Sequence, residues 1–177
     1  MPVAPAGNEG RMQHEFFMQA ALKEAEKALL SGEFPVGCVV VSDGRIIAKG
    51  SRSGTAGPSA NELDHAEIVA LRQVDGLKGA PDPCTMTIYS TMEPCLMCFG
   101  AILINGIERI VYAYEDVMGG GTRCPLDAMP RIYSNKNISI VSNILRNESL
   151  DLFKTFFSNT DNTYWRGSLL AEYTLAQ

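Results

Sequence analysis

The sequence has few histidines, little positive charge and no long apolar run. Its 177 residues include 2 histidines and 1 tryptophan, and 15 Lys and Arg stand against 20 Asp and Glu. The formal net charge of −5 does not suggest a strong nucleic-acid binder, which usually shows a basic stripe. It does not exclude one, because a local basic patch can coexist with an acidic total charge. Arg123, Arg131 and Lys136 are the longest hints of such a patch, and they are sparse in the sequence. No apolar run approaches the roughly 18 residues of a membrane helix, so we expect no contact with a membrane.

The 5 cysteines do not suggest a disulfide framework, because an odd number cannot pair completely. Cys38 lies in an apolar run and is expected in the core, whereas Cys84 and Cys124 lie in Pro-flanked loops. Residues 1–10 are rich in Pro, Gly and Ala and lack the pattern of a signal peptide. We therefore expect a flexible tail over 1–10, a single domain over 11–177, and a cytoplasmic protein.

Hydrophobic periodicity and turn residues predict alternating helices and strands. The predicted helices span 12–30, 65–74, 94–105 and 148–157, and the predicted strands span 36–41, 45–49, 86–90, 107–114 and 138–141. This order predicts a three-layer α/β/α fold with one mixed five-stranded sheet and helices on both faces. The first two strands should form an antiparallel edge hairpin, and the β-α-β units that start at Met86 and Ile107 should pair in parallel.

The most informative residues are His65 and Glu67, followed downstream by Pro94, Cys95 and Cys98. A structural zinc site normally has four protein ligands, whereas a catalytic one keeps three and leaves the fourth position to water. His65, Cys95 and Cys98 supply three. Both cysteines fall at the start of a predicted helix, where the helix dipole stabilises thiolates, and a spacing of three places them on one helix face. Glu67 is then available as a general base and acid.

Other interpretations of these residues remain open at this stage. Cys95 and Cys98 could form a redox pair, or a structural zinc site could take His14 or another cysteine as its fourth ligand. Asp64 lies three residues before Glu67, so Glu67 could instead complete a capping box at the helix start. The catalytic role of Glu67 is the interpretation we favour.

The motif H-x-E…P-C-x-x-C resembles that of the cytidine/deoxycytidylate deaminase superfamily. Segments 32–37, 65–72, 91–102 and 106–112 are similar to the bacterial tRNA adenosine deaminase and cytosine-guanine deaminase-like group, and the resemblance covers about 16–157. It implies a cytidine deaminase-like fold, Zn²⁺ as cofactor, and hydrolytic replacement of the exocyclic amine of a nucleobase by a keto oxygen, with release of ammonia. It also implies a homodimer that forms through the metal-bearing helices.

The flanking residues depart from this group near the predicted substrate. Many relatives carry Asn where this chain has Arg52, which could face a phosphate, a carboxylate or solvent. Asp116 fits a position that approaches the substrate nucleotide in the tRNA enzymes, and Ala66 lies within the motif. We therefore take Ala66, Arg52 and Asp116 as candidate substrate contacts. The C-terminal aromatic residues Tyr164 and Trp165 could cap the active site, although packing on the domain or a dimer partner is the expectation.

Substrate class is the least determined property. The acidic balance and the lack of a basic C-terminal helix favour a small purine or pyrimidine (free base, nucleoside or nucleotide), and tRNA adenosine is the alternative. A non-catalytic, zinc-stabilised partner subunit is a third hypothesis, weakened by the presence of Glu67. A pterin or riboflavin precursor is disfavoured, because the cysteine loop of that group is longer than Cys95-x-x-Cys98.

Overall fold

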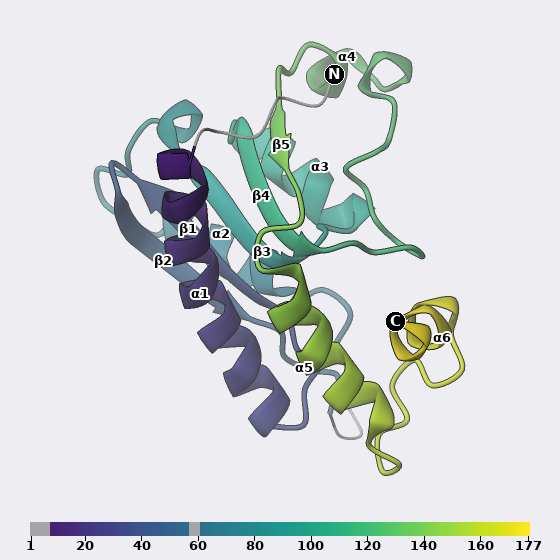
Figure 1. The fold of residues 1–177 in the computed structure, drawn as a ribbon. Helices are drawn as coiled ribbons and strands as arrows, with labels where there is room; N and C mark the ends of the chain where they lie inside the picture. The colour runs from purple at the N-terminus through teal and green to yellow at the C-terminus, as the bar shows by residue number, and fades with distance from the viewer. Residues whose placement is uncertain (1–7, 57–60) are drawn as a thin grey trace.

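The computed structural model describes residues 8–56 and 61–177. The helices are α1 (Asn8–Leu30), α2 (Ala66–Asp75), α3 (Leu96–Asn105), α4 (Arg131–Ser134), α5 (Arg146–Ser158) and α6 (Leu169–Ala176), with short 3₁₀ turns η1 (Pro83–Thr85) and η2 (Leu126–Ala128). The strands are β1 (Gly37–Ser42), β2 (Arg45–Ser51), β3 (Thr87–Met92), β4 (Arg109–Tyr114) and β5 (Ser139–Val141). Figure 1 shows these elements around a single sheet.

Helix α1 begins earlier than the sequence predicts. Residues 8–10 were expected in a flexible tail, but they form the first turn of α1. Glu9 lies in that turn, where a negative charge interacts favourably with the positive end of the helix dipole. Residues 1–7 of the predicted tail lie outside the described residues. The prediction of a tail is therefore wrong for its last three residues.

The sheet has five strands in the order β2-β1-β3-β4-β5. β1 pairs antiparallel with β2 and with β3, while β3–β4 and β4–β5 are parallel. Gly44 has φ of 71° in the turn between β1 and β2, a conformation that glycine adopts without steric cost. The predicted mixed sheet, its edge hairpin and its two parallel pairings are confirmed.

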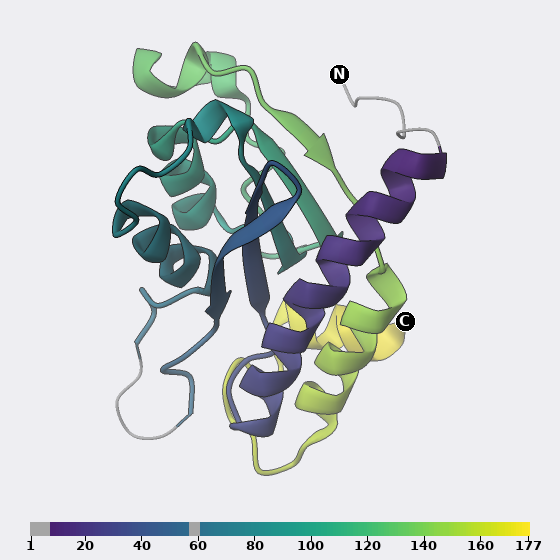
Figure 2. The same cartoon turned by 90° about the vertical axis from the view of Figure 1, so that its left-hand side faces the viewer.

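Helices cover both faces of this sheet (Figure 2), with α1 and α5 on one side and α2 and α3 on the other. Every residue of β1 is buried, and successive side chains pack on opposite faces of the sheet. Val39 and Val41 pack in the cluster with α1, whereas Cys38 and Val40 pack in the cluster with α2. This is the period of two that a strand buried on both faces requires. The predicted three-layer fold and the core position of Cys38 are confirmed.

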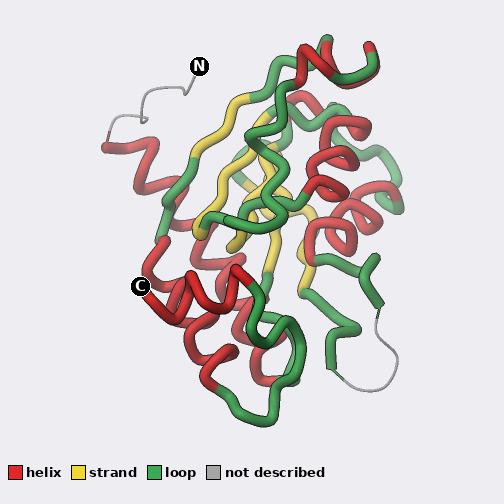
Figure 3. Tube along the Cα trace, turned by 90° about the vertical axis from the view of Figure 1, so that its right-hand side faces the viewer, coloured by secondary structure: helices red, strands yellow, loops and turns green. Residues whose placement is uncertain are grey.

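The C-terminal segment doubles back beside α5 and ends in α6, as Figures 1 and 3 show. Thr174 of α6 is buried, and its hydroxyl lies 3.0 Å from the Tyr114 hydroxyl at the end of β4. The segment is thereby held near the carboxyl ends of the parallel strands β3 and β4. In the described part of the chain, no helix combines the length and apolarity needed to span a bilayer.

Candidate active site

Two helix N-termini meet beside the carboxyl end of β3. His65 is the N-cap residue of α2, and Cys95 is the N-cap residue of α3, with Cys98 in the first turn. Neither N-cap side chain bonds the backbone of its own helix, so each is available to a ligand. The predicted placement of the motif at two helix starts is confirmed.

The three side chains have the spacing of a metal site. Sγ of Cys95 and Sγ of Cys98 each lie 3.5 Å from Nδ1 of His65. Zinc bonds of about 2.3 Å to sulfur and about 2.0 Å to nitrogen, at a tetrahedral angle, place these atoms about 3.5 Å apart. Within residues 8–56 and 61–177, they are the one group of three or more His, Cys, Asp or Glu side chains close enough to share an ion. The donor set and spacing therefore fit Zn²⁺, with three protein ligands.

This geometry decides between the interpretations of the cysteines. All 5 cysteines are free, so Cys95 and Cys98 are not a disulfide. No fourth His, Cys, Asp or Glu joins the group in the described residues, which argues against a closed structural zinc site. The hydrogen bond with Cys98 is the main reason that the pKa of Cys95 is lowered to about 4, and His65 contributes a second bond. A thiolate at Cys95 is the form that binds a metal ion.

Glu67 lies beside these ligands and is buried. Its Oε1 accepts a 2.8 Å hydrogen bond from the Ser90 hydroxyl, and its Oε2 lies 3.5 Å from Sγ of Cys98. The capping-box interpretation is wrong, because Asp64 pairs with Arg72 instead of capping α2. Burial raises the pKa of Glu67, and the nearby Cys95 charge raises it further. A carboxyl group with a raised pKa can take up and return a proton.

Ser90 is a site residue that the sequence analysis missed. It lies on β3 and is fully buried, with its hydroxyl directed at Glu67. The only signal in the sequence is a pair of small polar residues, Ser90 and Thr91, within a strand that is otherwise apolar toward the core. Its partner lies 23 residues away, so only the fold identifies its role.

Close backbone packing fixes the start of α2. A Cβ atom on Gly50 of β2 would lie 1.9 Å from the carbonyl oxygen of Ala66, so only glycine fits there. Strand β2 thereby approaches the first turn of α2, which carries Glu67. Ala66 is fully buried and lines the pocket. Its proposed contact with substrate stays a prediction.

Aromatic side chains from two distant segments form the outer wall of the pocket. Phe34, from the loop before β1, lies next to Tyr164 and Trp165, which follow α5. The rings of Tyr164 and Trp165 stack at a centroid distance of 5.4 Å. All three residues line the same pocket as His65 and Glu67. The aromatic residues of the C-terminal segment therefore pack on the domain, as expected, and also cover the site.

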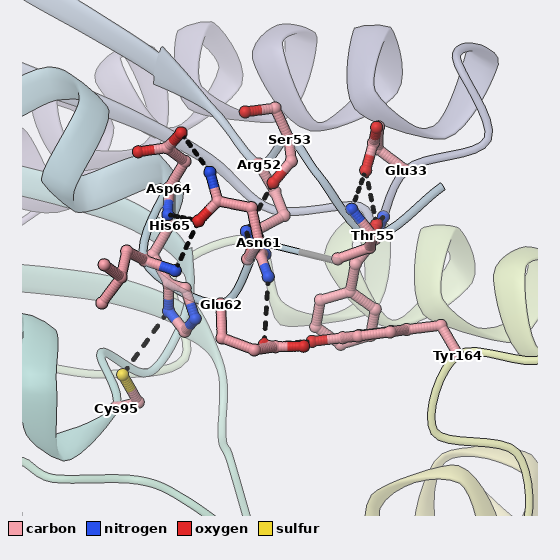
Figure 4. Close-up of polar contacts among 12 residues, drawn as sticks. Glu33, Arg52, Ser53, Thr55, Asn61, Glu62, Asp64, His65, Cys95 and Tyr164 are labelled. Carbon is pink, nitrogen blue, oxygen red and sulfur yellow. Dashed lines mark hydrogen bonds and ion pairs between the residues drawn. The ribbon is translucent and has the colours of Figure 1, made fainter. Parts of the chain in front are cut away.

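Arg52 lies in the wall of this pocket and is only 2% exposed, so the interpretation that it faces solvent is wrong. Its Nη1 donates to the carbonyl oxygens of Ser53 and Asn61, and its Nη2 lies 3.1 Å from Oε2 of Glu62. Figure 4 shows these contacts beside His65. The guanidinium thus faces a carboxylate, one of the partners considered from the sequence, but that carboxylate belongs to the chain itself. A contact of Arg52 with substrate remains a prediction.

Asp116 also lines the pocket and is buried. Its Oδ1 accepts hydrogen bonds of 2.9 and 2.8 Å from the backbone N–H groups of Met118 and Gly119. Burial raises the pKa of Asp116. The carboxylate thus organises the loop after β4, and Gly120 of that loop forms a bridge with Cys95. The predicted contact with substrate is untested by these bonds and stays a prediction.

Comparisons with known proteins agree with this geometry. Residues 11–114 match the profile of the cytidine and deoxycytidylate deaminase zinc-binding region. A tRNA-specific adenosine deaminase from Streptococcus pyogenes serotype M18 (strain MGAS8232) is 32% identical over 145 residues, which are 82% of this chain and 90% of that protein. The tRNA-specific adenosine deaminase of Haemophilus influenzae (strain ATCC 51907 / DSM 11121 / KW20 / Rd) is 36% identical over 146 residues, 81% of this chain and 82% of that protein.

Solved structures show the same relationship. A structure from work on A-to-I editing by tRNA:A34 deaminases at the wobble position of transfer RNA superimposes with a TM-score of 0.61 at 32% identity, covering 77% of this chain and 98% of that chain. Guanine deaminase from Bacillus subtilis superimposes with a TM-score of 0.51 at 35% identity, covering 58% of this chain and 64% of that chain. By its fold, its His-Cys-Cys zinc site and its matching sequence, the chain belongs to the cytidine and deoxycytidylate deaminase family.

Proposed function

We propose that this protein is a hydrolytic deaminase that replaces the exocyclic amine of a nucleobase with a keto oxygen. Glu67 carries the proposal, because its buried carboxylate lies against the metal ligand Cys98 and is held by Ser90. When bound to His65, Cys95 and Cys98, zinc supplies the acidification of a water molecule. Glu67 would accept one proton from a water molecule and deliver it to the ring nitrogen while the water oxygen bonds to the ring carbon. The second proton of that water would pass to the amine, and the carbon–nitrogen bond would break to release ammonia and leave the keto group.

The wall of the pocket supports a small substrate: a free base, a nucleoside or a nucleotide. Phe34, Tyr164 and Trp165 line the same pocket as His65 and Cys95. Tyr164 and Trp165 come from the C-terminal segment of the chain, after α5. A flat ring stacks well on aromatic faces. A free base, nucleoside or nucleotide needs no path for a polynucleotide backbone beside this wall.

A second candidate substrate is the adenosine of a tRNA. Support comes from the curated relatives, which are tRNA-specific adenosine deaminases and align over more than four fifths of this chain. Enzymes of that kind take the target base out of its stack and into a pocket. The basic residues Arg123 and Lys136 line a surface hollow beside Thr122, and Thr122 bonds Glu93 next to the metal ligands. That hollow would suit the phosphates of a nucleic acid.

One assay separates the two candidates. Ammonia release would be measured on cytosine, adenine and guanine, on their nucleosides and nucleotides, and on a tRNA anticodon stem-loop. Turnover of a small compound, and none of the stem-loop, supports the small-substrate proposal; the reverse result supports the tRNA candidate. A zinc-loaded protein that releases ammonia from none of them would contradict the proposed function.

The same assay tests the role of Glu67. The substitution Glu67→Ala should abolish ammonia release while the zinc content, measured by atomic emission, stays the same. Glu26→Ala, at an exposed position on α1, is a matched control and should retain activity. Full activity in the Glu67 variant would refute the mechanism. A zinc-loaded, unmodified protein without activity on any of the compounds would instead favour the hypothesis of a zinc-stabilised partner subunit.

We also propose that the protein forms a homodimer through α3. One face of this helix, with Phe99 and Ile102, is buried in the core. Three further apolar side chains on the helix remain exposed: Leu96, Met97 and Ile104. Exposed apolar side chains grouped on one element are typical of an interface. Light scattering during size-exclusion chromatography tests this proposal: a monomer at micromolar concentration would contradict it.

A further inference from the structure

A chain of polar contacts connects the wall of the pocket to the C-terminal segment. Oε2 of Glu62 accepts from Nη2 of Arg52 at 3.1 Å and from the Tyr164 hydroxyl at 3.0 Å. Glu62 and Tyr164 are 102 residues apart in the sequence. In Figure 4 the three side chains form a continuous line that passes next to His65. A single carboxylate oxygen therefore joins a buried arginine to the aromatic wall.

Arg52 is well held at its own end of this chain of contacts. Its Nη1 bonds the carbonyl oxygens of Ser53 at 2.5 Å and Asn61 at 2.7 Å. Asn61 in turn bonds Asp64, the residue before His65. An arginine fork that binds several acceptors at once loses little freedom for each added bond. Arg52 is thus a fixed point from which Glu62 can be positioned.

The other end of the chain of contacts is weakly held. The Glu62 side chain is 55% exposed, and Trp165 is 37% exposed with φ of 54°. A tryptophan seldom adopts this left-handed backbone conformation, which costs energy unless the surroundings impose it. Tyr164 packs on Trp165 and on Phe34, so the contact with Glu62 adds a polar restraint to this aromatic wall.

We propose that Arg52 is a positioning residue that acts through Glu62 to hold Tyr164 and Trp165 against the pocket, and that this contact sets the size of the substrate. Arg52 binds Glu62, Glu62 binds the Tyr164 hydroxyl, and Trp165 stacks on Tyr164. With the contact in place, the wall presents ring faces to a planar base. Without it, the segment from 159 to 168 swings outward and the pocket admits larger substrates. The effect on substrate size rests on the deaminase function proposed above; the contact itself does not.

The single tryptophan of the chain makes the wall directly observable. Two conservative variants, Glu62→Gln and Tyr164→Phe, remove the charge or the hydroxyl and keep the shape. Both should increase the quenching of Trp165 fluorescence by acrylamide. Tyr173→Phe is the matched control, because Tyr173 also donates to a carboxylate, that of Glu115, but does not line the pocket. It should leave the quenching unchanged.

Kinetics test the effect on substrate. The bond from the Tyr164 hydroxyl to the Glu62 carboxylate stabilises the closed wall, because a hydrogen bond to a charged group is stronger than a neutral one. Its loss should raise KM for the small substrate about tenfold, while kcat changes less than about twofold. The double variant of Glu62 and Tyr164 should be no worse than either single variant, because both break one contact. Arg52→Lys keeps the charge and should behave like these variants, since an ammonium group cannot reproduce the fork.

Several results would overturn the proposal. Trp165 quenching that is the same in Glu62→Gln, Tyr164→Phe and the unmodified protein would show that the aromatic packing alone holds the segment. Strictly additive effects in the double variant would show that the two residues do not act together. If quenching increases as expected but no compound is deaminated, the contact stands and the proposed function fails.

Discussion

The Ser90 hydroxyl donates a 2.8 Å hydrogen bond to Oε1 of Glu67, and both side chains are buried. The bond ties Oε1 of Glu67, a residue of α2, to Ser90 on β3. The other oxygen, Oε2, lies on the side of Cys98. A general base must be held at the correct distance from the proton that it moves. Ser90 is therefore expected to act on the rate of the reaction through Glu67.

Substitution of Ser90 by Ala should lower kcat by about 10- to 100-fold, since a hydrogen bond to a charged group contributes about 1.5–3 kcal/mol. Zinc content should not change. Ser42→Ala is a suitable control, because Ser42 is also a buried strand serine but pairs with Thr85, away from the site. Equal kcat values for the Ser90 variant and the unmodified protein would contradict this role.

Removal of zinc should lower thermal stability. The ligands come from two different helices, so a bound ion joins α2 to α3 only in the folded chain. At free zinc 100-fold above Kd, binding contributes about 2.7 kcal/mol, which corresponds to about 5–10 °C for a chain of this length. Calorimetry with and without a chelator measures the difference. The Cys98→Ser variant should show little response to the chelator, whereas an unchanged midpoint in the unmodified protein would argue against a metal site.

The loop after β4 should not tolerate a side chain at Gly120. A Cβ atom there would lie 2.6 Å from Cδ of Glu93 and 2.6 Å from the carbonyl oxygen of Asp116. We expect Gly120→Ala to destabilise the protein by about 1–3 kcal/mol and to reduce activity, because the loop pairs with Cys95.

Gly76 offers a matched control for this substitution. It has φ of −78°, and its nearest contact for a Cβ is 3.5 Å. Gly76→Ala should therefore be neutral, or stabilising by up to about 1 kcal/mol. Urea denaturation of both variants gives the comparison. Equal stabilities would show that the loop can move away from Glu93.

The attachment of α6 should weaken in acid. Burial tends to raise the pKa of Glu115, but hydrogen bonds from Arg146 and Tyr173 outweigh it and lower the pKa to about 2. A carboxylate with a depressed pKa in the folded state stabilises the fold fully above its unfolded pKa, about 4.5, and this contribution is lost as the pH falls toward 2.

Thermal melting between pH 6 and pH 2 tests this ion pair. The Glu115→Gln variant lacks the titrating group, so its stability should decrease less over this range than that of the unmodified protein. Arg146→Gln removes the partner of Glu115. At pH 6 it should lower the melting temperature by about as much as Glu115→Gln does. Parallel pH profiles for the Glu115 variant and the unmodified protein would show that another group dominates the acid response.

Local patterns were sufficient for much of the fold. The start of α2 at His65, the start of α3 at Cys95 and the turn at Gly44 all follow from short segments, because hydrophobic periodicity, a proline at a helix start and turn preferences act over a few residues. The start of α1 was less well predicted, since a Pro- and Gly-rich neighbourhood concealed its first turn. Helices α4 and α6 were not delimited, because short elements depend on tertiary packing more than on their own sequence.

The amino-acid sequence by itself predicted the residues of the candidate site: His65, Cys95 and Cys98 as zinc ligands at two helix starts, and Glu67 as the carboxylate beside them. Tertiary structure alone decided what surrounds them. Ser90 reaches Glu67 across 23 residues, and Tyr164 reaches Glu62 across 102. The physical reason is that ligand spacing within a motif is fixed by helix geometry, whereas the pocket wall depends on how distant segments pack. That wall, with Arg52 and Trp165, is the part of the molecule to which we assign substrate choice.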